Sequence, residues 1–163
     1  MGGIVHSTLN DLSKKTRSQV IDALNAELAG AIDFQLQTKQ AHWNVKGPSF
    51  IALHKLFDEI SEEAEEYVDL IAERIVQLGG VAEGTRRIVA DRSKLPDYPT
   101  TIASGDEHVA ALSKSIAAFG ARIRKAIERM NKLGDADAAD ICTEISRGLD
   151  KWLWFVEAHL AAR

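Results

Sequence analysis

Three prolines limit where helices can break in this 163-residue chain, and they stand at Pro48, Pro96 and Pro99. A proline inside a helix costs about 3 kcal/mol, so the proline-free runs 1–47, 49–95 and 100–163 each have room for long helices. Alanine, the best helix former, occurs 23 times, and strong β-formers never alternate with polar residues over the length of a strand. The sequence therefore predicts an all-α fold.

Apolar residues recur in steps of three and four, which is the spacing of one helix face. This spacing predicts four long helices, over about 13–43, 49–78, 104–133 and 135–161. Asn10 or Ser13 is the expected N-cap of the first helix, and Asp135 can cap the last.

One connection is much longer than the others. Residues 81–103 contain the last two prolines and a stretch near 84–92 that is expected to be a short helix. A chain that crosses the length of a bundle needs a connection of this kind. The predicted architecture is therefore a ferritin-like four-helix bundle with one long crossover. Residues 1–12 are expected to form a short N-terminal tail, and 13–163 a single bundle domain.

Composition narrows the class of protein further. Lys and Arg number 20 and Asp and Glu number 24, giving a net charge of −4, and 45% of the residues are hydrophobic. These values are typical of one soluble globular domain, and they disfavour a strongly basic DNA-clamping protein. No run approaches the roughly 18 apolar residues of a membrane span, and the N-terminus lacks an apolar signal region. The lone Cys142 is expected to be a small buried apolar residue in a protein of the reducing cytoplasm.

Two pairs of potential metal ligands lie on the second predicted helix. His54 with Asp58, and Asp69 with Glu73, are each four residues apart, so each pair shares a helix face. His42, near the end of the first helix, is a third candidate imidazole. On spacing alone, a solvated helix face explains each pair better than a metal site does.

The distance between the two pairs restricts how one metal site could use both. Asp58 and Asp69 are eleven residues apart, which places them about 20° apart around the helix but about 16 Å apart along it. One ion cannot bridge that gap within one helix, so a shared site requires a second copy of the chain. A two-fold axis near Glu63 and Ala64 would bring the first pair of one subunit opposite the second pair of its mate, twice per dimer. None of the twelve glutamates has a histidine three positions later, which argues against a ferritin-type di-iron site within one subunit.

Several segments around these residues resemble the Dps family, the DNA-binding proteins from starved cells, also called miniferritins. They are 38–48 (TKQAHWNVKGP), 50–54 (FIALH), 56–58 (LFD), 72–74 (AER), 77–80 (QLGG) and 149–155 (LDKWLWF). The resemblance spans nearly the whole chain after residue 13. It implies a hollow dodecamer that oxidises ferrous iron, preferably with hydrogen peroxide, and stores ferric mineral. The metal ligands that it implies are His42, His54 and Asp58 from one subunit and Asp69 and Glu73 from its two-fold mate.

The resemblance also suggests roles for residues beside the site. Trp43 adjoins His42, and Trp154 matches a family position near the site, so either could quench a stray oxidising equivalent; core packing explains both equally well. Trp152 is expected to pack in the core. Lys39 matches another family position near the site, where it could pair with a carboxylate or lie on the surface.

Iron must also enter such a shell. Asp135, Asp137 and Asp140 cluster at the start of the last helix. They could form an acidic ring at a three-fold pore that attracts ferrous ions, or they could cap the helix and offset its dipole. The remaining histidines have no ligand partner at helical spacing and are interpreted as structural or surface residues: His6, His108 and His159.

The sequence argues against strong DNA binding, which usually requires a basic arm. No Lys or Arg precedes Lys14, and the C-terminus offers only Arg163. We therefore predict weak or absent DNA binding. The leading hypothesis is a cytoplasmic ferroxidase and iron-storage protein that limits oxidative damage. The alternatives are a nucleoid-associated protein that coats DNA, with iron oxidation secondary, and a purely structural or signalling bundle.

Overall fold

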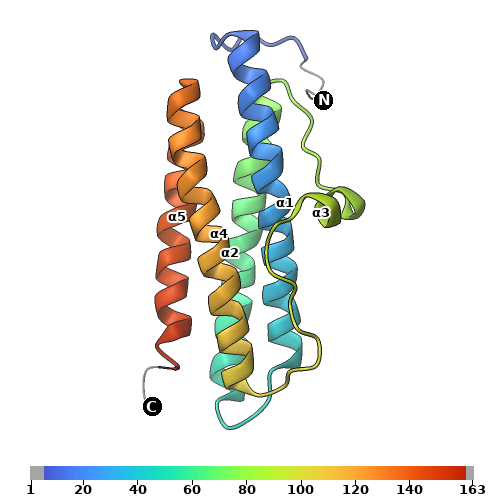
Figure 1. The fold of residues 1–163 in the computed structure, drawn as a ribbon, viewed down its shortest axis with the longest axis vertical. Coiled ribbons are helices and arrows are strands. Elements are labelled where there is room, and N and C mark those ends of the chain that lie inside the picture. The colour runs from blue at the N-terminus through green and yellow to red at the C-terminus, as the bar shows by residue number, and fades with distance from the viewer. Residues whose placement is uncertain (1–5, 161–163) are drawn as a thin grey trace.

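The computed structural model describes residues 6–160, and in this range the chain forms helices and no strand. The helices are α1 (Lys14–Asn44), α2 (Phe50–Gln77), α3 (Arg86–Arg92), α4 (Gly105–Leu133) and α5 (Ala136–Glu157). The four long helices run side by side, and the short α3 lies outside the bundle against α1 (Figure 1). The predicted ferritin-like bundle with a helix in its long crossover is confirmed.

Helix boundaries agree closely with the sequence prediction. The ends of α1, α2 and α4 differ from it by one residue at most, and α3 begins two residues later than expected. The last helix stops at Glu157, and the predicted end at 161 lies outside the described residues. Ser13 is the N-cap of α1, because its side chain accepts a hydrogen bond from the Thr16 backbone N–H at 3.1 Å. Asn10 instead accepts from the Leu12 N–H in the preceding turn.

The crossover determines which helices pack together. Helices α1 and α2 form one antiparallel pair, α4 and α5 form another, and the crossover returns the chain so that α4 packs along α1 (Figure 1). The predicted apolar stripes meet inside this bundle. The largest fully buried side chains come from three of the helices and include Phe34, Phe57 and Phe119.

The turn between α1 and α2 is tied to the start of α4. The Lys46 N–H donates to the Ala103 carbonyl at 2.9 Å, and the Gly105 N–H donates back to the Lys46 carbonyl at 3.1 Å. Gly105 also lies so close to Leu53 that a Cβ there would approach the Leu53 side chain to 2.6 Å. These contacts fix the end of the bundle at which α1 and α2 present His42 and His54. Among the described residues no helix is long and apolar enough to cross a membrane.

Candidate metal centre

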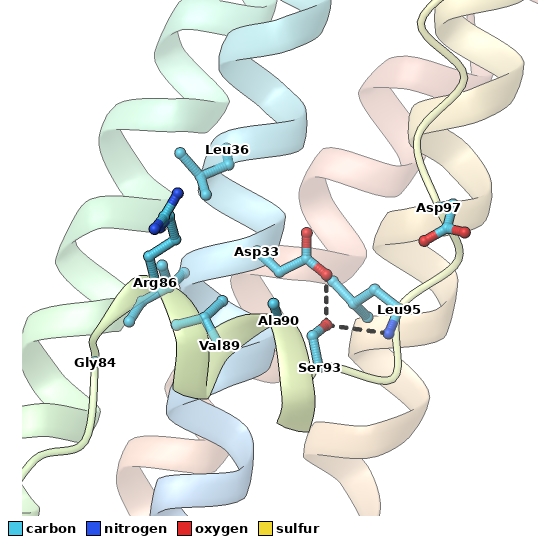
Figure 2. Close-up of a pocket in the computed structure, with 10 residues that line it drawn as sticks. Asp33, Leu36, Gly84, Arg86, Val89, Ala90, Ser93, Leu95 and Asp97 are labelled. Carbon is cyan, nitrogen blue, oxygen red and sulfur yellow. Dashed lines mark hydrogen bonds between the residues drawn. The ribbon is translucent and has the colours of Figure 1, made fainter.

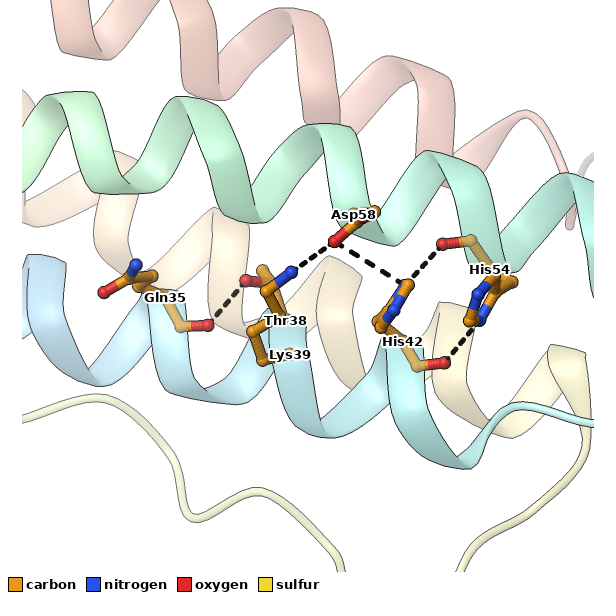
Figure 3. A network of polar contacts seen from close by, with 6 residues as sticks. All are labelled: Gln35, Thr38, Lys39, His42, His54 and Asp58. Atoms are coloured by element: carbon orange, nitrogen blue, oxygen red, sulfur yellow. Dashed lines mark hydrogen bonds and ion pairs between the residues drawn. The ribbon is translucent and has the colours of Figure 1, made fainter.

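Two imidazoles lie face to face where α1 ends and α2 begins (Figure 3). The rings of His42 and His54 stack with their centroids 3.8 Å apart and their planes 21° from parallel. Each ring also bonds to the other residue's backbone: His42 Nδ1 lies 2.8 Å from the His54 carbonyl oxygen, and His54 Nδ1 lies 2.8 Å from the His42 carbonyl oxygen. Two reciprocal contacts therefore hold both rings.

These contacts fix the proton positions on the two rings. A carbonyl oxygen can only accept a hydrogen bond, so each Nδ1 carries the proton and donates it. When such a ring binds a metal ion, it does so through the lone pair of Nε2, the nitrogen left free. Histidine ligands in metal sites are commonly held in this way, with the other ring nitrogen donating to a carbonyl or carboxylate.

Asp58 adds a carboxylate beside the imidazoles. Its Oδ1 lies 3.8 Å from His42 Nδ1 and forms an ion pair with the Lys39 ammonium, one turn before His42 on α1 (Figure 3). The hydrogen bond from Lys39 lowers the pKa of Asp58, with smaller contributions from the two histidines. Lys39 therefore pairs with a carboxylate of the candidate site, one of the two arrangements expected from the sequence. In this arrangement its ammonium is paired with Oδ1, one of the two oxygens through which Asp58 could bind a metal ion.

The second pair of acidic residues is separate from the first. Asp69 and Glu73 are exposed on α2, three to four turns beyond His54 and Asp58. Within residues 6–160, no three His, Cys, Asp or Glu side chains are grouped so that they could hold a metal ion. The two imidazoles and the Asp58 carboxylate are therefore neighbours without forming a complete metal site in the single chain, and Asp69 and Glu73 lie apart from them.

Comparisons with known proteins identify the family. A family model for the ferritin-like domain matches residues 21–162. The DNA protection during starvation protein of Agrobacterium fabrum is 48% identical over 155 residues, which cover 95% of this chain and 96% of that protein. The chain belongs to the Dps family.

Solved Dps structures share the same fold. A tetragonal form of Mycobacterium smegmatis Dps superposes with a TM-score of 0.90 at 34% identity, covering 96% of this chain and 94% of that one. DpsA14 from Streptomyces coelicolor gives a TM-score of 0.91 at 32% identity, covering 98% and 95%. The similarity extends over the whole bundle.

The tryptophans of this Dps-family chain fall into two groups. Trp43 and Trp154 are each 67% exposed, so packing in the subunit core does not explain either residue. Trp152 is buried against the core, as expected, with the Lys151 ammonium 4.0 Å from its ring centroid. Phe155 joins the two tryptophans of α5, because its ring meets Trp152 and Trp154 edge-on at 5.6 and 4.9 Å.

The three aspartates at the start of α5 also differ from one another. Asp135 is only 1% exposed, and its Oδ1 accepts hydrogen bonds from Arg74 Nη2 at 2.5 Å and from the Ala138 N–H at 3.0 Å. It therefore caps α5 and joins that helix to the end of α2. Asp137 and Asp140 are exposed, although Asp137 Oδ2 approaches Arg74 Nη1 at 3.4 Å. Arg74 could not be recognised as a partner of Asp135 from the sequence, because nothing in the local pattern links residues 61 positions apart.

Two residues that the sequence did not assign to the metal site, Cys142 and His108, are buried. Cys142 lies in the core, where burial raises the pKa of its thiol to about 12, so it is the inert apolar residue expected. His108 is buried as well, but it bonds to Tyr98 of the crossover, a partner that helical spacing could not reveal. His159 is exposed.

A separate hollow lies on the opposite side of α1 from α2, between α1 and the crossover. Its volume is about 540 Å³, and Asp33, Leu36, Arg86 and Ser93 are among the residues around it (Figure 2). The Asp33 carboxylate accepts hydrogen bonds from the Ser93 hydroxyl and from Gln37 Nε2, so it already serves to anchor the crossover to α1. None of the five predicted metal ligands lines this hollow.

Proposed function

We propose that the protein is a ferroxidase and iron-storage protein of the Dps type, acting on ferrous iron and preferring hydrogen peroxide as oxidant. The reaction occurs at sites shared by two subunits, and the ferric product is stored in a hollow dodecamer. The observation that carries this proposal is the pair of imidazoles whose Nδ1 atoms are both bound to backbone carbonyls, beside a carboxylate. Membership of the Dps family supports a protective, iron-storing role.

A two-fold axis near the middle of α2 completes the site. Pairing two antiparallel α2 helices so that His54 faces the partner's Glu73 also makes Asp58 face the partner's Asp69, because the four positions are symmetric about Glu63 and Ala64. Each dimer then contains two equal sites. Asp69 and Glu73 are exposed on the isolated chain, so both are available to a partner.

The ligand set suits the oxidation of iron. Imidazole binds ferrous iron well, and carboxylates favour harder, more highly charged ions, so a mixed set can hold iron in both oxidation states. Ferrous ions bound close together can give peroxide two electrons and so avoid releasing hydroxyl radical. Iron would compete with the Lys39 ammonium for Oδ1 of Asp58. Trp43 and Trp154, both exposed, would donate an electron to an oxidant that escapes.

The same scheme assigns iron entry to the start of α5. Exposed carboxylates from three subunits around a three-fold axis would attract ferrous ions by their summed charge. Asp137 and Asp140 are the exposed members of the predicted trio, whereas Asp135 is committed to Arg74 and the helix cap. The entry role therefore belongs to Asp137 and Asp140.

Two inactive variants, assembled together in one shell, test whether the subunits share the site. His54→Ala and Glu73→Ala should each abolish rapid iron oxidation by peroxide while leaving assembly intact, as judged by size-exclusion mass. Co-expressed at equal levels, they should recover about one quarter of the wild-type sites, because half the dimers are mixed and each mixed dimer has one intact site. Recovery of no activity in shells shown to be mixed would contradict a shared site. His159→Ala, which changes an exposed histidine elsewhere, is the matched control and should keep full activity.

We further propose that DNA binding is weak or absent. Among the basic residues at the start of α1, Arg17 is buried and donates to the Leu78 carbonyl at 2.9 Å, so it is unavailable to phosphates. Lys14 and Lys15 are exposed but belong to the helix rather than to a free arm. A gel-shift assay at low salt without divalent cations should show little retention of plasmid. Strong retention would instead favour the DNA-coating alternative.

A further inference from the structure

A partly buried tyrosine and a buried histidine form a pair that has no role in the proposed function. The Tyr98 hydroxyl lies 2.7 Å from His108 Nδ1, with the two ring centroids 6.0 Å apart. His108, in the first turn of α4, is 1% exposed, and its Nε2 is buried without a hydrogen-bond partner among the described residues. Tyr98 belongs to the crossover and is partly buried.

Burial keeps both partners of the pair neutral. It lowers the pKa of His108, so the ring is neutral at pH 7, and it raises the pKa of Tyr98, so the phenol keeps its proton. We assign the phenol as the donor to Nδ1, with the ring's own proton on Nε2. The carboxylate of Glu107 and the backbone of Asn44 both act on His108 in the opposite direction to burial, because they favour a positive ring. Glu107 and the Asn44 backbone would therefore stabilise the positive charge that an additional proton gives to His108.

We infer that Tyr98 and His108 form a proton-coupled redox site, in which Tyr98 gives one electron to a strong oxidant while its proton passes to His108. The oxidant is hydroxyl radical, formed where a ferrous ion without a second ion beside it reduces hydrogen peroxide and the O–O bond breaks to hydroxide and the radical. This inference rests on the proposed function, which brings ferrous iron and peroxide together in the protein.

The electrons and protons balance in two steps. In the first, the electron from Tyr98 reduces hydroxyl radical to hydroxide, the phenol O–H bond breaks, and Nδ1 of His108 binds the proton. The products are a neutral tyrosyl radical and a positively charged imidazole. In the second, another ferrous ion returns an electron to the radical, and the proton moves back from Nδ1 to the phenol oxygen. The sum is two ferrous ions oxidised per peroxide, with two hydroxide ions formed and the pair restored.

The fold places the pair next to the candidate iron site. Asn44, which faces His108, ends the helix that carries His42, two residues earlier. The backbone bonds of Lys46 with Ala103 and Gly105 join the same turn to the start of α4. The turn that follows His42 is therefore joined to the start of α4, which carries His108, the partner of Tyr98. A radical formed on Tyr98, which is partly buried, would be held in the protein.

The other tyrosine of the chain is a weaker candidate. Tyr67 donates to Glu63 Oε1 at 2.5 Å, but the other oxygen of that carboxylate is paired with the Lys151 ammonium at 3.0 Å. Imidazole is ordinarily a stronger base than a carboxylate by about two pKa units, and the Glu63 carboxylate already has the Lys151 ammonium as a partner. His108 is thus the better proton acceptor, and Tyr67 serves as the internal comparison.

The test generates the oxidant without iron. The iron-free assembled protein is exposed to a photo-oxidised ruthenium polypyridyl complex, frozen, and examined for a tyrosyl radical by electron paramagnetic resonance. Because the chain has two tyrosines, Tyr67→Phe leaves Tyr98 as the sole source and should keep the signal, while Tyr98→Phe should lose it. His108→Gln keeps a hydrogen-bond acceptor but no proton acceptor, so radical formation should slow by about 10²-fold, the low end of what a positioned base contributes. A merely structural role for the pair would leave that rate unchanged.

Two results would overturn the inference, and neither depends on the iron site. They are a Tyr67→Phe protein that yields no tyrosyl radical, and a His108→Gln protein that forms it at the wild-type rate. The Tyr67→Phe result remains decisive even where Tyr98→Phe fails to fold. Ferrous iron and peroxide are then added to wild-type protein in a second arm. Absence of iron oxidation there would refute the proposed function, whereas oxidation without any tyrosyl radical in rapidly frozen samples would refute only the role of Tyr98.

Discussion

The ion pair between Arg74 and Asp135 provides the sharpest stability prediction. The Asp135 side chain is almost wholly buried, caps α5 through the Ala138 N–H, and accepts from Arg74 Nη2 at 2.5 Å. Arg74 is itself buried and retains two longer contacts of 3.4 Å, to Asp137 and to the Gln77 side chain, when Asp135 is removed. Asp135→Ala therefore removes a helix cap and leaves a buried guanidinium poorly paired.

The expected cost follows from these two losses. Replacing an Asp N-cap by Ala costs about 1 kcal/mol, and breaking a buried ion pair costs about 3–5 kcal/mol. Because Asp137 remains near Arg74, the low end applies, and the total is about 4 kcal/mol. Asp135→Asn keeps a good cap, so it should cost about 3 kcal/mol. One kcal/mol shifts the Tm of a domain of this size by about 2–4 °C, so Asp135→Ala should melt about 8–16 °C lower.

Denaturation followed by circular dichroism measures these differences. Wild type, Asp135→Ala, Asp135→Asn and Asp137→Ala must be compared at one protein concentration, because assembly links stability to concentration. Asp137, 79% exposed, is the matched control and should lose less than about 1 kcal/mol. Equal denaturation midpoints for Asp135→Ala and Asp137→Ala would refute this reasoning. Asp135 would then contribute no more to stability than an exposed aspartate does.

Three further predictions concern the stability of the fold, the titration of Asp58 and the rate of iron uptake. Gly148→Ala should destabilise the fold by about 1–3 kcal/mol, because its Cβ would meet the Tyr67 hydroxyl at 1.8 Å; Gly120→Ala, whose Cβ would meet only the flexible end of an arginine at 3.4 Å, should gain up to about 1 kcal/mol in urea denaturation. Lys39→Met should raise the pKa of Asp58 in a carboxyl NMR titration, since Lys39 is the main cause of its lowering. The Lys39–Asp58 ion pair stabilises the fold at pH values above the ordinary carboxyl pKa, and this contribution is lost as the pH falls through the lowered pKa of Asp58. Lys39→Met should therefore lose stability at neutral pH and not at low pH. An unmoved Asp58 titration would show that the ion pair is absent in solution. Replacing Asp137 and Asp140 by Asn should slow iron uptake without changing Tm, and an unchanged rate would refute their entry role.

Much of the fold could be predicted because its determinants are local. Proline positions, the three-and-four spacing of apolar residues and the caps at Ser13 and Asp135 act within one or two turns of helix, and each is visible in the printed sequence. The crossover was predictable from its length alone. The end of α5 was placed too late because the apolar pattern continues to Leu160 after the helix has ended at Glu157.

The candidate site could be predicted only in part. The spacing of His54 and Asp58 indicates a shared face, and helix geometry shows that Asp69 is too far away to join them in one chain. No local pattern shows that two imidazoles stack and exchange bonds with each other's carbonyls, because that depends on how α1 and α2 meet. The bonds from Arg74 to Asp135 and from Tyr98 to His108 likewise arise from packing between elements.

The arrangement suggests why iron chemistry in this protein would require assembly. On the proposed pairing, one subunit supplies both imidazoles in a fixed geometry, and its mate supplies two exposed carboxylates. In the single chain, Lys39 neutralises Asp58, and Asp69 and Glu73 lie too far along α2 to assist. A lone subunit would therefore bind ferrous iron weakly, and oxidation would begin only where the partner's carboxylates outcompete the ammonium for the metal-binding face. Linking the ligand set to the dimer in this way confines the reaction with peroxide to assembled protein, where the ferric product has an enclosed space to enter.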